Sequence, residues 1–177
     1  MRVLISGPPG CGKSALAEEL ILAYSSRPHY FATLPRRPVH AERIARHERR
    51  RGASWSLYEA SGESVRDLSA LRTGLSQAPI VLIDGLGIWL WACMHAHGSR
   101  ARRVHLKSLH RAVLDTLESA TSWIIVDVQP AIGLRMDATL RAQLIELHRS
   151  IAELPFTRTL RLRNAPQHDN SQSTLGG

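Results

Sequence analysis

Short apolar runs recur along the chain and are separated by longer segments of mixed polarity. Val3-Leu4-Ile5, Ile80 to Ile83 and Trp123 to Val126 are apolar throughout, which is typical of strands buried on both faces of a parallel sheet. Strands are predicted at residues 2–6, 29–33, 55–59, 80–84, 123–127 and 158–163. Helix-forming residues predict helices at 15–22, 41–51, 64–75, 86–97, 104–118 and 138–154. This alternation predicts a doubly wound α/β fold, with a mainly parallel sheet and helices on both faces.

The same pattern predicts how the chain is organised. Val65, Leu68 and Leu71 form the apolar face of the helix at 64–75. The most apolar window, residues 78–94, is shorter than a membrane-spanning helix and contains Asp84, so we expect a core strand and helix there and no membrane span. A length of 177 residues, 44% of them hydrophobic, predicts a single domain over residues 1–163. The polar residues 164–177 predict a disordered tail.

The net charge of the chain and the distribution of its basic residues indicate which anionic partners it could bind. The formal net charge is +8, which is compatible with nucleic-acid binding or with a pocket for anionic small molecules. The arginines gather at residues 43–51 and 100–111, and the two lysines are Lys13 and Lys107. With only 5% aromatic residues, stacking platforms for single strands are not expected. We therefore expect a nucleoside triphosphate as partner and no nucleic acid.

Cysteine usage indicates a reducing compartment. Cys11 and Cys93 are far apart and form neither a disulfide framework nor a CxxC unit. The first residues lack the charged and long apolar regions of a secretion signal. A cytoplasmic location is the expectation.

The most informative motif follows the first predicted strand. It fits the phosphate-loop pattern G-x-x-x-x-G-K-[ST], whose glycines turn backbone N–H groups toward phosphate oxygens at the start of a helix. The lysine reaches the terminal phosphates and the serine hydroxyl ligates Mg²⁺. The motif predicts a P-loop NTPase-like fold that binds ATP or GTP. Its residues are Gly7, Pro8, Pro9, Gly10, Cys11, Gly12, Lys13 and Ser14.

Two aspartates end predicted strands at the edge where a ligand is expected. Asp84 would complete the Mg²⁺ site opposite Ser14, and the alternative is that it caps the helix after Gly85. Asp127 either positions a substrate hydroxyl or caps a helix.

The basic helix at residues 41–51 contains a second candidate. Arg43, Arg50 and Arg51 lie at positions i−4, i+3 and i+4 from His47, so they predict a cationic face around the imidazole. Like charge would keep the ring neutral, and the arginines could hold a polyphosphate while His47 attacks an α-phosphorus. By spacing alone, a solvated basic helix with a bystander histidine is the better interpretation.

An ordered set of motifs favours a functional role for His47 over a bystander role. Tyr30-Phe31-Ala32-Thr33 is followed by Arg43-Ile44-x-x-His47, then by Arg51, Trp55 and Glu59, and then by Asp84-Gly-Leu-Gly-Ile-Trp89-Leu90. This order resembles the bifunctional adenosylcobinamide kinase / adenosylcobinamide-phosphate guanylyltransferase family of cobalamin biosynthesis, from residue 1 to about residue 94.

The resemblance implies that a nucleoside triphosphate phosphorylates adenosylcobinamide, and that GMP from GTP then passes through a guanylylated His47 to the new phosphate. It also implies a homo-oligomer, with a trimer favoured. The nucleotide contacts that it implies, besides the phosphate loop, are Ala32, Thr33, Leu34, Glu48, Arg49, Arg50, Arg51, Glu59 and Asp84.

The second half departs from the family pattern. Asp127-Val128-Gln129-Pro130-Ala131 replaces the usual Thr/Ser-Asn-Glu-Val-Gly stretch, and the late motifs near residues 141–142 and 148–149 are also replaced. The alternatives are therefore a generic P-loop small-molecule kinase whose basic helix is a lid, a nucleotide-binding relative without catalysis, and a nucleic-acid-binding module.

The remaining histidines and tryptophans predict no further site. His95, His97, His105 and His110 lack the acid or cysteine set that would complete a zinc site. Trp89 and Trp91 favour a core or subunit contact over a stacking platform.

Overall fold

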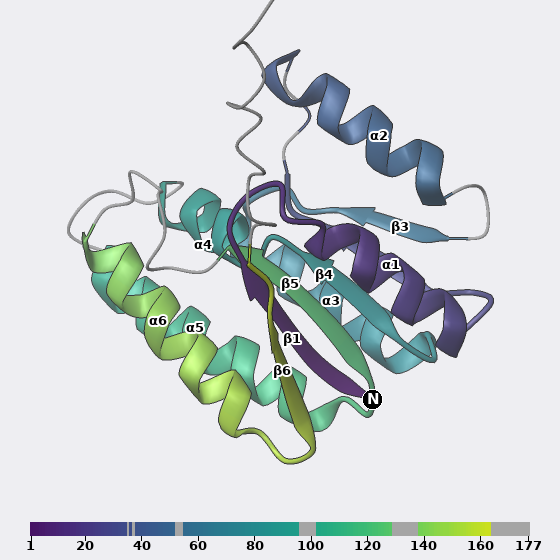
Figure 1. The fold of residues 1–177 in the computed structure, drawn as a ribbon. Coiled ribbons are helices and arrows are strands. Elements are labelled where there is room, and N and C mark those ends of the chain that lie inside the picture. Colours follow the sequence, from purple (N-terminus) through teal and green to yellow (C-terminus); the bar gives the residue numbers. More distant parts are fainter. Residues whose placement is uncertain (35, 37, 52–54, 96–101, 129–137, 164–177) are drawn as a thin grey trace, which may run out of the picture.

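The computed structural model describes residues 1–34, 36, 38–51, 55–95, 102–128 and 138–163. In this part of the chain, six parallel strands form one sheet in the order β3-β2-β4-β5-β1-β6 (Figure 1). The strands are β1 (Arg2–Gly7), β2 (His29–Ala32), β3 (Ser56–Glu59), β4 (Val81–Asp84), β5 (Trp123–Val128) and β6 (Thr157–Arg161). The predicted α/β fold and its parallel sheet are confirmed.

Six α-helices connect these strands in the described residues, each close to its predicted position. They are α1 (Lys13–Tyr24), α2 (Ala41–Arg51), α3 (Ser64–Gln77), α4 (Leu86–His95), α5 (Arg102–Ser119) and α6 (Ala138–Glu153), with a 3₁₀ turn, η1 (Pro38–His40), before α2. None of the helices is long and apolar enough to cross a membrane, as judged over the described residues. The apolar window predicted as core contains β4 and α4, as expected.

Alternation of side chains along the strands separates two hydrophobic cores. Val3 and Ile5 of β1 pack with Ala17 and Ile21 of α1 on one face of the sheet. Leu4 points to the other face, where α3, α4, α5 and α6 supply the opposing side chains (Figure 1). Because successive residues of a strand face opposite sides, continuous apolar runs are needed for a sheet covered on both faces.

Two apolar side chains, Val65 of α3 and Leu57 of the edge strand β3, are exposed. Val65 is 77% exposed, so its predicted place on the apolar face of α3 is wrong; Leu68 and Leu71 alone of the three are buried. β3 pairs only with β2, at the edge of the sheet, and Leu57 is 47% exposed. An edge strand has one neighbouring strand to pack against, which explains why Leu57 is exposed.

The strand order places the candidate residues. β5 lies between β1 and β4, so the strand before the phosphate loop and the strand ending in Asp84 are not adjacent. Register pairs Ala32 with both Asp84 and Glu59, and pairs Ser6 with Asp127. The carboxyl ends of the strands therefore meet at one edge, which is where ligands bind in open α/β sheets.

Several predictions fall outside the described residues. They are the disordered tail at 164–177, the family departures at 129–136 and His97.

Candidate nucleotide site

The phosphate loop connects β1 to α1 through backbone that only glycine adopts readily. Gly10 and Gly12 have φ angles of 77° and 89°, in the left-handed region, and Gly12 is the N-cap of α1. The Lys13 ammonium, 7% exposed, donates to the Pro8 carbonyl of its own loop. The loop is thus curled around its lysine at the N-terminus of a helix, the arrangement that accepts phosphate.

Gly7 is required for a different reason. A Cβ at this position would lie 2.7 Å from the carbonyl oxygen of Leu162, whose N–H donates to the Ser6 carbonyl. The first glycine of the motif therefore permits close packing of the chain after β6 against β1.

A cavity of about 390 Å³ opens in front of the loop, within the range of ligand pockets. We call it the phosphate cavity. Its lining includes the predicted residues Pro9, Gly10, Gly12, Lys13, Ser14, His47, Arg50 and Asp84.

A second, much smaller cavity of about 30 Å³ is also lined by His47 and Asp84. It collects most of the residues that the family resemblance implied, although they come from β2, β3, β4 and α2. Those lining it are Ala32, Thr33, Leu34, His47, Glu48, Arg51, Glu59 and Asp84. Gly7, Pro8, Cys11 and Arg49 are described but line neither cavity.

His47 lies at the junction of the two cavities with 12% of its side chain exposed. Its Nδ1 atom is 3.3 Å from Glu18 Oε1, 3.7 Å from Asp84 Oδ2 and 3.2 Å from Arg50 Nη2. Arg50 of the predicted cationic face does lie beside the ring, but the prediction is incomplete, because two carboxylates lie there as well. The helical spacing revealed only the charges on α2 itself; the side chain of Arg43 is outside the described part.

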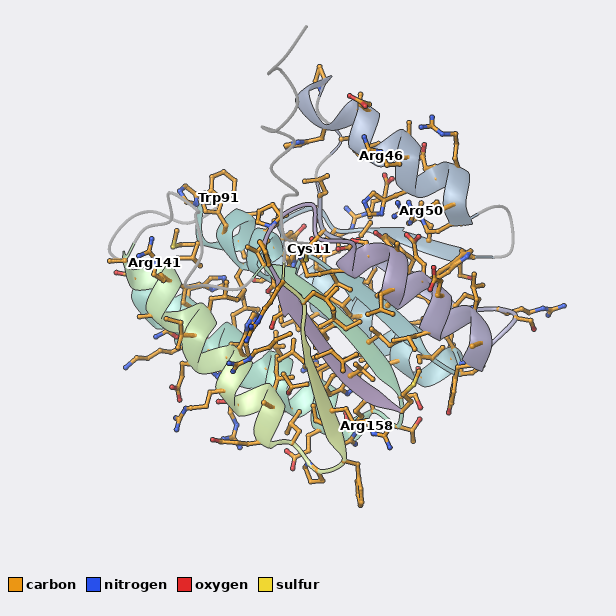
Figure 2. All side chains as sticks on the ribbon, viewed as in Figure 1. Cys11, Arg46, Arg50, Trp91, Arg141 and Arg158 are labelled. Atoms are coloured by element: carbon orange, nitrogen blue, oxygen red, sulfur yellow. The ribbon has the colours of Figure 1, made fainter. Side chains whose placement is uncertain are left out.

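Glu18 joins α1 to α2. Its carboxylate accepts hydrogen bonds from Arg50 Nε at 2.6 Å and Nη2 at 3.3 Å, and Arg50 lies between the two helices in Figure 2. Burial acts to raise the pKa of Glu18, but hydrogen bonds from His47 and Arg50 outweigh it and lower this pKa below its ordinary value. The carboxylate is therefore ionised at neutral pH.

Asp84 is held from the opposite side. The Tyr30 hydroxyl donates to Asp84 Oδ2 at 2.7 Å, and the guanidinium carbon of Arg51 lies 3.8 Å from the centre of the Tyr30 ring. Burial, and next the Asp84 charge, raise the pKa of Tyr30 well above its ordinary value. Tyr30 is therefore a hydrogen-bond donor that fixes the Asp84 carboxylate at the cavity wall.

The donor set in the phosphate cavity suits Mg²⁺. Ser14 and Asp84 offer a hydroxyl and a carboxylate oxygen in one cavity, and Mg²⁺ prefers few protein oxygens supplemented by phosphate and water. Among the described residues, no group of three or more His, Cys, Asp or Glu side chains could hold a metal.

Asp127 lines the phosphate cavity, and its contacts show the capping role that was one of its two predictions. Its Oδ2 accepts hydrogen bonds from the Gly87 N–H at 2.8 Å and pairs with His148 Nε2 at 3.0 Å. Asp127, near the end of β5, thus caps α4, the helix that follows the neighbouring strand β4. A Cβ at Gly87 would lie 2.8 Å from Leu144 Cδ2, so a larger residue here would have to displace the Leu144 side chain.

The tryptophans have separate roles. Trp89 is 1% exposed and donates its Nε1–H to the buried Asp67 carboxylate, as expected of a core residue. Trp91 is 41% exposed and its ring lies 4.2 Å from that of His95.

Sequence reasoning missed Glu18 and His148. Glu18 contacts His47, which is 29 positions away in the sequence, and His148 contacts Asp127, which is 21 positions away. The only signal for Glu18 was its place one helical turn after Ser14, on the same face of α1.

Comparison with known proteins assigns the family. The family model described as cobinamide kinase / cobinamide phosphate guanyltransferase matches residues 3–144, well over half of the chain. The chain belongs to this family. The matched segment includes the phosphate loop, His47 and Asp84, and it confirms the resemblance that the ordered motifs indicated.

Other comparisons add little to this assignment. No curated protein matches the chain. The ATPase EscN of the enteropathogenic E. coli type III secretion system is 15% identical, with a TM-score of 0.48 over 82% of this chain, which spans 40% of EscN. The DnaC helicase loader is 18% identical, with a TM-score of 0.42 over 91% of this chain and 78% of its own. Likenesses this weak carry no argument about function.

Proposed function

We propose that this member of the family phosphorylates adenosylcobinamide with ATP or GTP, and then transfers GMP from GTP through His47 to adenosylcobinamide phosphate. The observation that carries the proposal is that His47 lines the same cavity as Lys13 and Ser14. A triphosphate on the phosphate loop would extend its α-phosphate within reach of that wall. Family membership supplies the substrate class.

The kinase step uses the phosphate loop. Lys13 exchanges its contact with the Pro8 carbonyl for phosphate oxygens, and the loop N–H groups at the start of α1 hold the remaining charge. Mg²⁺, held by Ser14 and Asp84, would neutralise phosphate charge when bound. The chain thereby aligns the γ-phosphoryl group with the substrate hydroxyl, and alignment supplies most of the rate.

The guanylyl step uses the wall between the cavities. Arg50 faces the phosphate cavity and Arg51 the second cavity, so cationic groups flank the path of a triphosphate past His47. A histidine nucleophile divides the transfer into two displacements at phosphorus. Glu48 and Glu59, which share Arg36 at 2.7 Å and 2.6 Å, close the far side of the second cavity.

The biological setting follows from the same family. We propose a cytoplasmic location, a homo-oligomer with a trimer favoured, and a single domain over residues 1–163. These assignments rest on family resemblance and composition.

Covalent labelling tests the proposal. The protein is incubated with GTP labelled at the α-phosphate and examined for protein-bound label that is acid-labile and base-stable, as a phosphoramidate is. We expect label on the wild type and none on His47→Ala. Phosphate transfer to adenosylcobinamide without any adduct would leave only the kinase step of the proposal. If the protein binds nucleotide but shows neither reaction, the alternatives are a kinase for another small substrate, with α2 as a lid, and a nucleotide-binding relative without catalysis.

A further inference from the structure

Glu18 is a buried carboxylate with no part in the two steps above. It is 5% exposed, although it belongs to a helix whose neighbouring Glu19 is exposed. A buried charge is costly unless it is paired. Its partners are His47 and Arg50 on α2, so the burial of Glu18 depends on the helix that holds the nucleophile.

The contacts of Glu18 determine where the imidazole proton lies. An ionised carboxylate only accepts hydrogen bonds, so the 3.3 Å contact between Glu18 Oε1 and His47 Nδ1 requires hydrogen on Nδ1. Arg50 Nη2 is 3.2 Å from the same nitrogen, but a guanidinium only donates and would need a lone pair there. Arg50 Nε and one N–H of Nη2 are directed to the two oxygens of Glu18, and the second N–H of Nη2 competes for a lone pair on His47 Nδ1. Two carboxylate oxygens near Nδ1, those of Glu18 and Asp84, favour hydrogen on Nδ1 over that lone pair.

We propose that Glu18 is a positioning residue that holds the proton of His47 on Nδ1 and thereby leaves the Nε2 lone pair for attack on phosphorus. This inference rests on the proposed guanylyl transfer. Asp84 Oδ2, at 3.7 Å from Nδ1, reinforces the preference electrostatically but is beyond hydrogen-bonding distance.

The same arrangement balances charge during the transfer. The Nε2 lone pair forms a bond to the α-phosphorus of GTP, while the bond from that phosphorus to the bridging oxygen breaks and pyrophosphate leaves with its electron pair. The Nδ1 proton stays on the ring, so the guanylylated ring is an imidazolium beside the Glu18 carboxylate. An oxygen of adenosylcobinamide phosphate then attacks the α-phosphorus, and the P–N electron pair returns to Nε2.

Tautomer detection by ¹⁵N NMR tests the inference without any turnover. Histidine-labelled protein shows which ring nitrogen carries hydrogen, and the His47 signals are assigned by their loss in His47→Gln. We expect the Nδ1–H form in the wild type and in the control Glu19→Gln. In Glu18→Gln the amide can donate or accept and Arg50 is released, so the Nε2–H form should gain population. A wild type in the Nε2–H form would overturn the inference.

Kinetics then separates positioning from structural support. At saturating GTP, adduct formation by Glu18→Gln should slow by about 100-fold or more, because loss of an orienting carboxylate costs up to about 10⁴-fold in the Ser-His-Asp triad. The affinity for ATP, which depends on the phosphate loop, should stay within about threefold. Glu18→Asp, which restores the charge on a shorter side chain, should recover part of the rate.

The outcomes distinguish this inference from the proposed function. If the wild type forms no adduct, the proposed function fails, while the tautomer still reports on Glu18. If the wild type forms the adduct and Glu18→Gln does so at the same rate, the inference fails and the proposed function stands. If Glu18→Gln does not fold, the wild-type tautomer and the rate of Glu18→Asp decide.

Discussion

The ammonium group of Lys13 contacts atoms of its own phosphate loop. It donates to the Pro8 carbonyl and lies 3.7 Å from Cys11 Sγ, contacts that a phosphate oxygen replaces with a charge-assisted hydrogen bond. The loop is therefore prepared for an anion, and the lysine needs only a small change of partner to bind it.

Replacing this lysine should weaken nucleotide binding. We expect Lys13→Ala to lower the binding free energy for ATP and GTP by about 2 kcal/mol, roughly 30-fold in Kd, because a hydrogen bond to a charged group is lost. Titration with a fluorescent nucleotide measures it. The matched control is Lys107→Ala, at the other lysine of the chain, on exposed α5 surface. Equal affinities for the two variants would contradict the assignment of the loop.

His29 makes stability depend on pH. Burial lowers the pKa of its imidazole below the ordinary value of 6.5, and its Nε2 has no hydrogen-bond partner among the described residues. The unfolded chain therefore binds the proton more readily than the folded chain, and the free energy of unfolding decreases as pH falls below about 6.5.

Urea unfolding at about pH 7.5 and about pH 5.5 measures this effect. We expect His29→Leu to lose less stability than the wild type over that interval. Burial also lowers the pKa of His110, so some dependence should remain in the variant. A wild-type slope retained in full by His29→Leu would show that this imidazole is not the titrating group.

Local patterns revealed some site residues and concealed others. The phosphate loop is contiguous and its glycines, lysine and serine each have a required chemistry, so Lys13 and Ser14 could be predicted from spacing alone. His47 needed the ordered motifs, because a histidine on a basic helix has no unique meaning. Glu18 was missed because its partners come from another helix, and this also made the predicted surrounding of His47 incomplete.

At the scale of elements, α4 is fixed at the cavity by a cap from the adjacent strand. Asp127, 2% exposed, accepts from the Gly87 N–H, from the Val128 N–H and from His148. The turn after Asp84 is held as well, since the Gly85 N–H donates to the Val126 carbonyl. The ends of β4 and β5 and the start of α4 therefore behave as one unit.

Removing this cap should destabilise the fold. Asp127→Ala leaves two N–H groups and an imidazole without their acceptor, and we expect a loss of about 3–5 kcal/mol in the free energy of unfolding. Asp115→Ala is the control, because its carboxylate is 51% exposed and pairs only with Arg111 on α5 among the described residues; it should cost no more than about 1 kcal/mol. Similar losses in urea unfolding for both variants would refute the capping role.

The positions of the elements were predictable, and the burial of individual positions was less so. Apolar runs marked β1, β4 and β5 because a parallel sheet covered on both faces requires them. Val65 was misplaced because three apolar residues at helical spacing are compatible with more than one face, and only the neighbours of α3 decide which one is covered. β3 was harder still, since its burial depends on its being at the edge.

At the scale of the molecule, the sheet order could not be predicted. Alternating strands and helices are compatible with many orders, and only the structure places β5 between β1 and β4. That order separates the phosphate loop from Asp84 by one strand, which leaves room at the carboxyl edge for the phosphate cavity.

Several arginines in and near α2 are paired with glutamates of the same chain. On α2, Arg46 and Arg50 pair with Glu42 and Glu18, and Arg36 pairs with Glu48 of α2 and with Glu59 of β3. We expect no micromolar affinity for duplex or single-stranded nucleic acid at physiological salt. Fluorescence anisotropy with labelled oligonucleotides tests this, and tight binding that falls steeply with salt would support a nucleic-acid module instead.

We propose that His47, which lines both cavities, carries the guanylyl group from GTP to the corrinoid phosphate. A pulse–chase measurement tests this transfer: the protein is labelled with GTP carrying α-³²P, freed of nucleotide, and then mixed in a rapid-quench device with adenosylcobinamide phosphate and an excess of unlabelled GTP. We predict that label leaves the protein and appears in adenosylcobinamide-GDP at least as fast as steady-state turnover. Label that stays on the protein while unlabelled GTP is turned over to product would contradict the account.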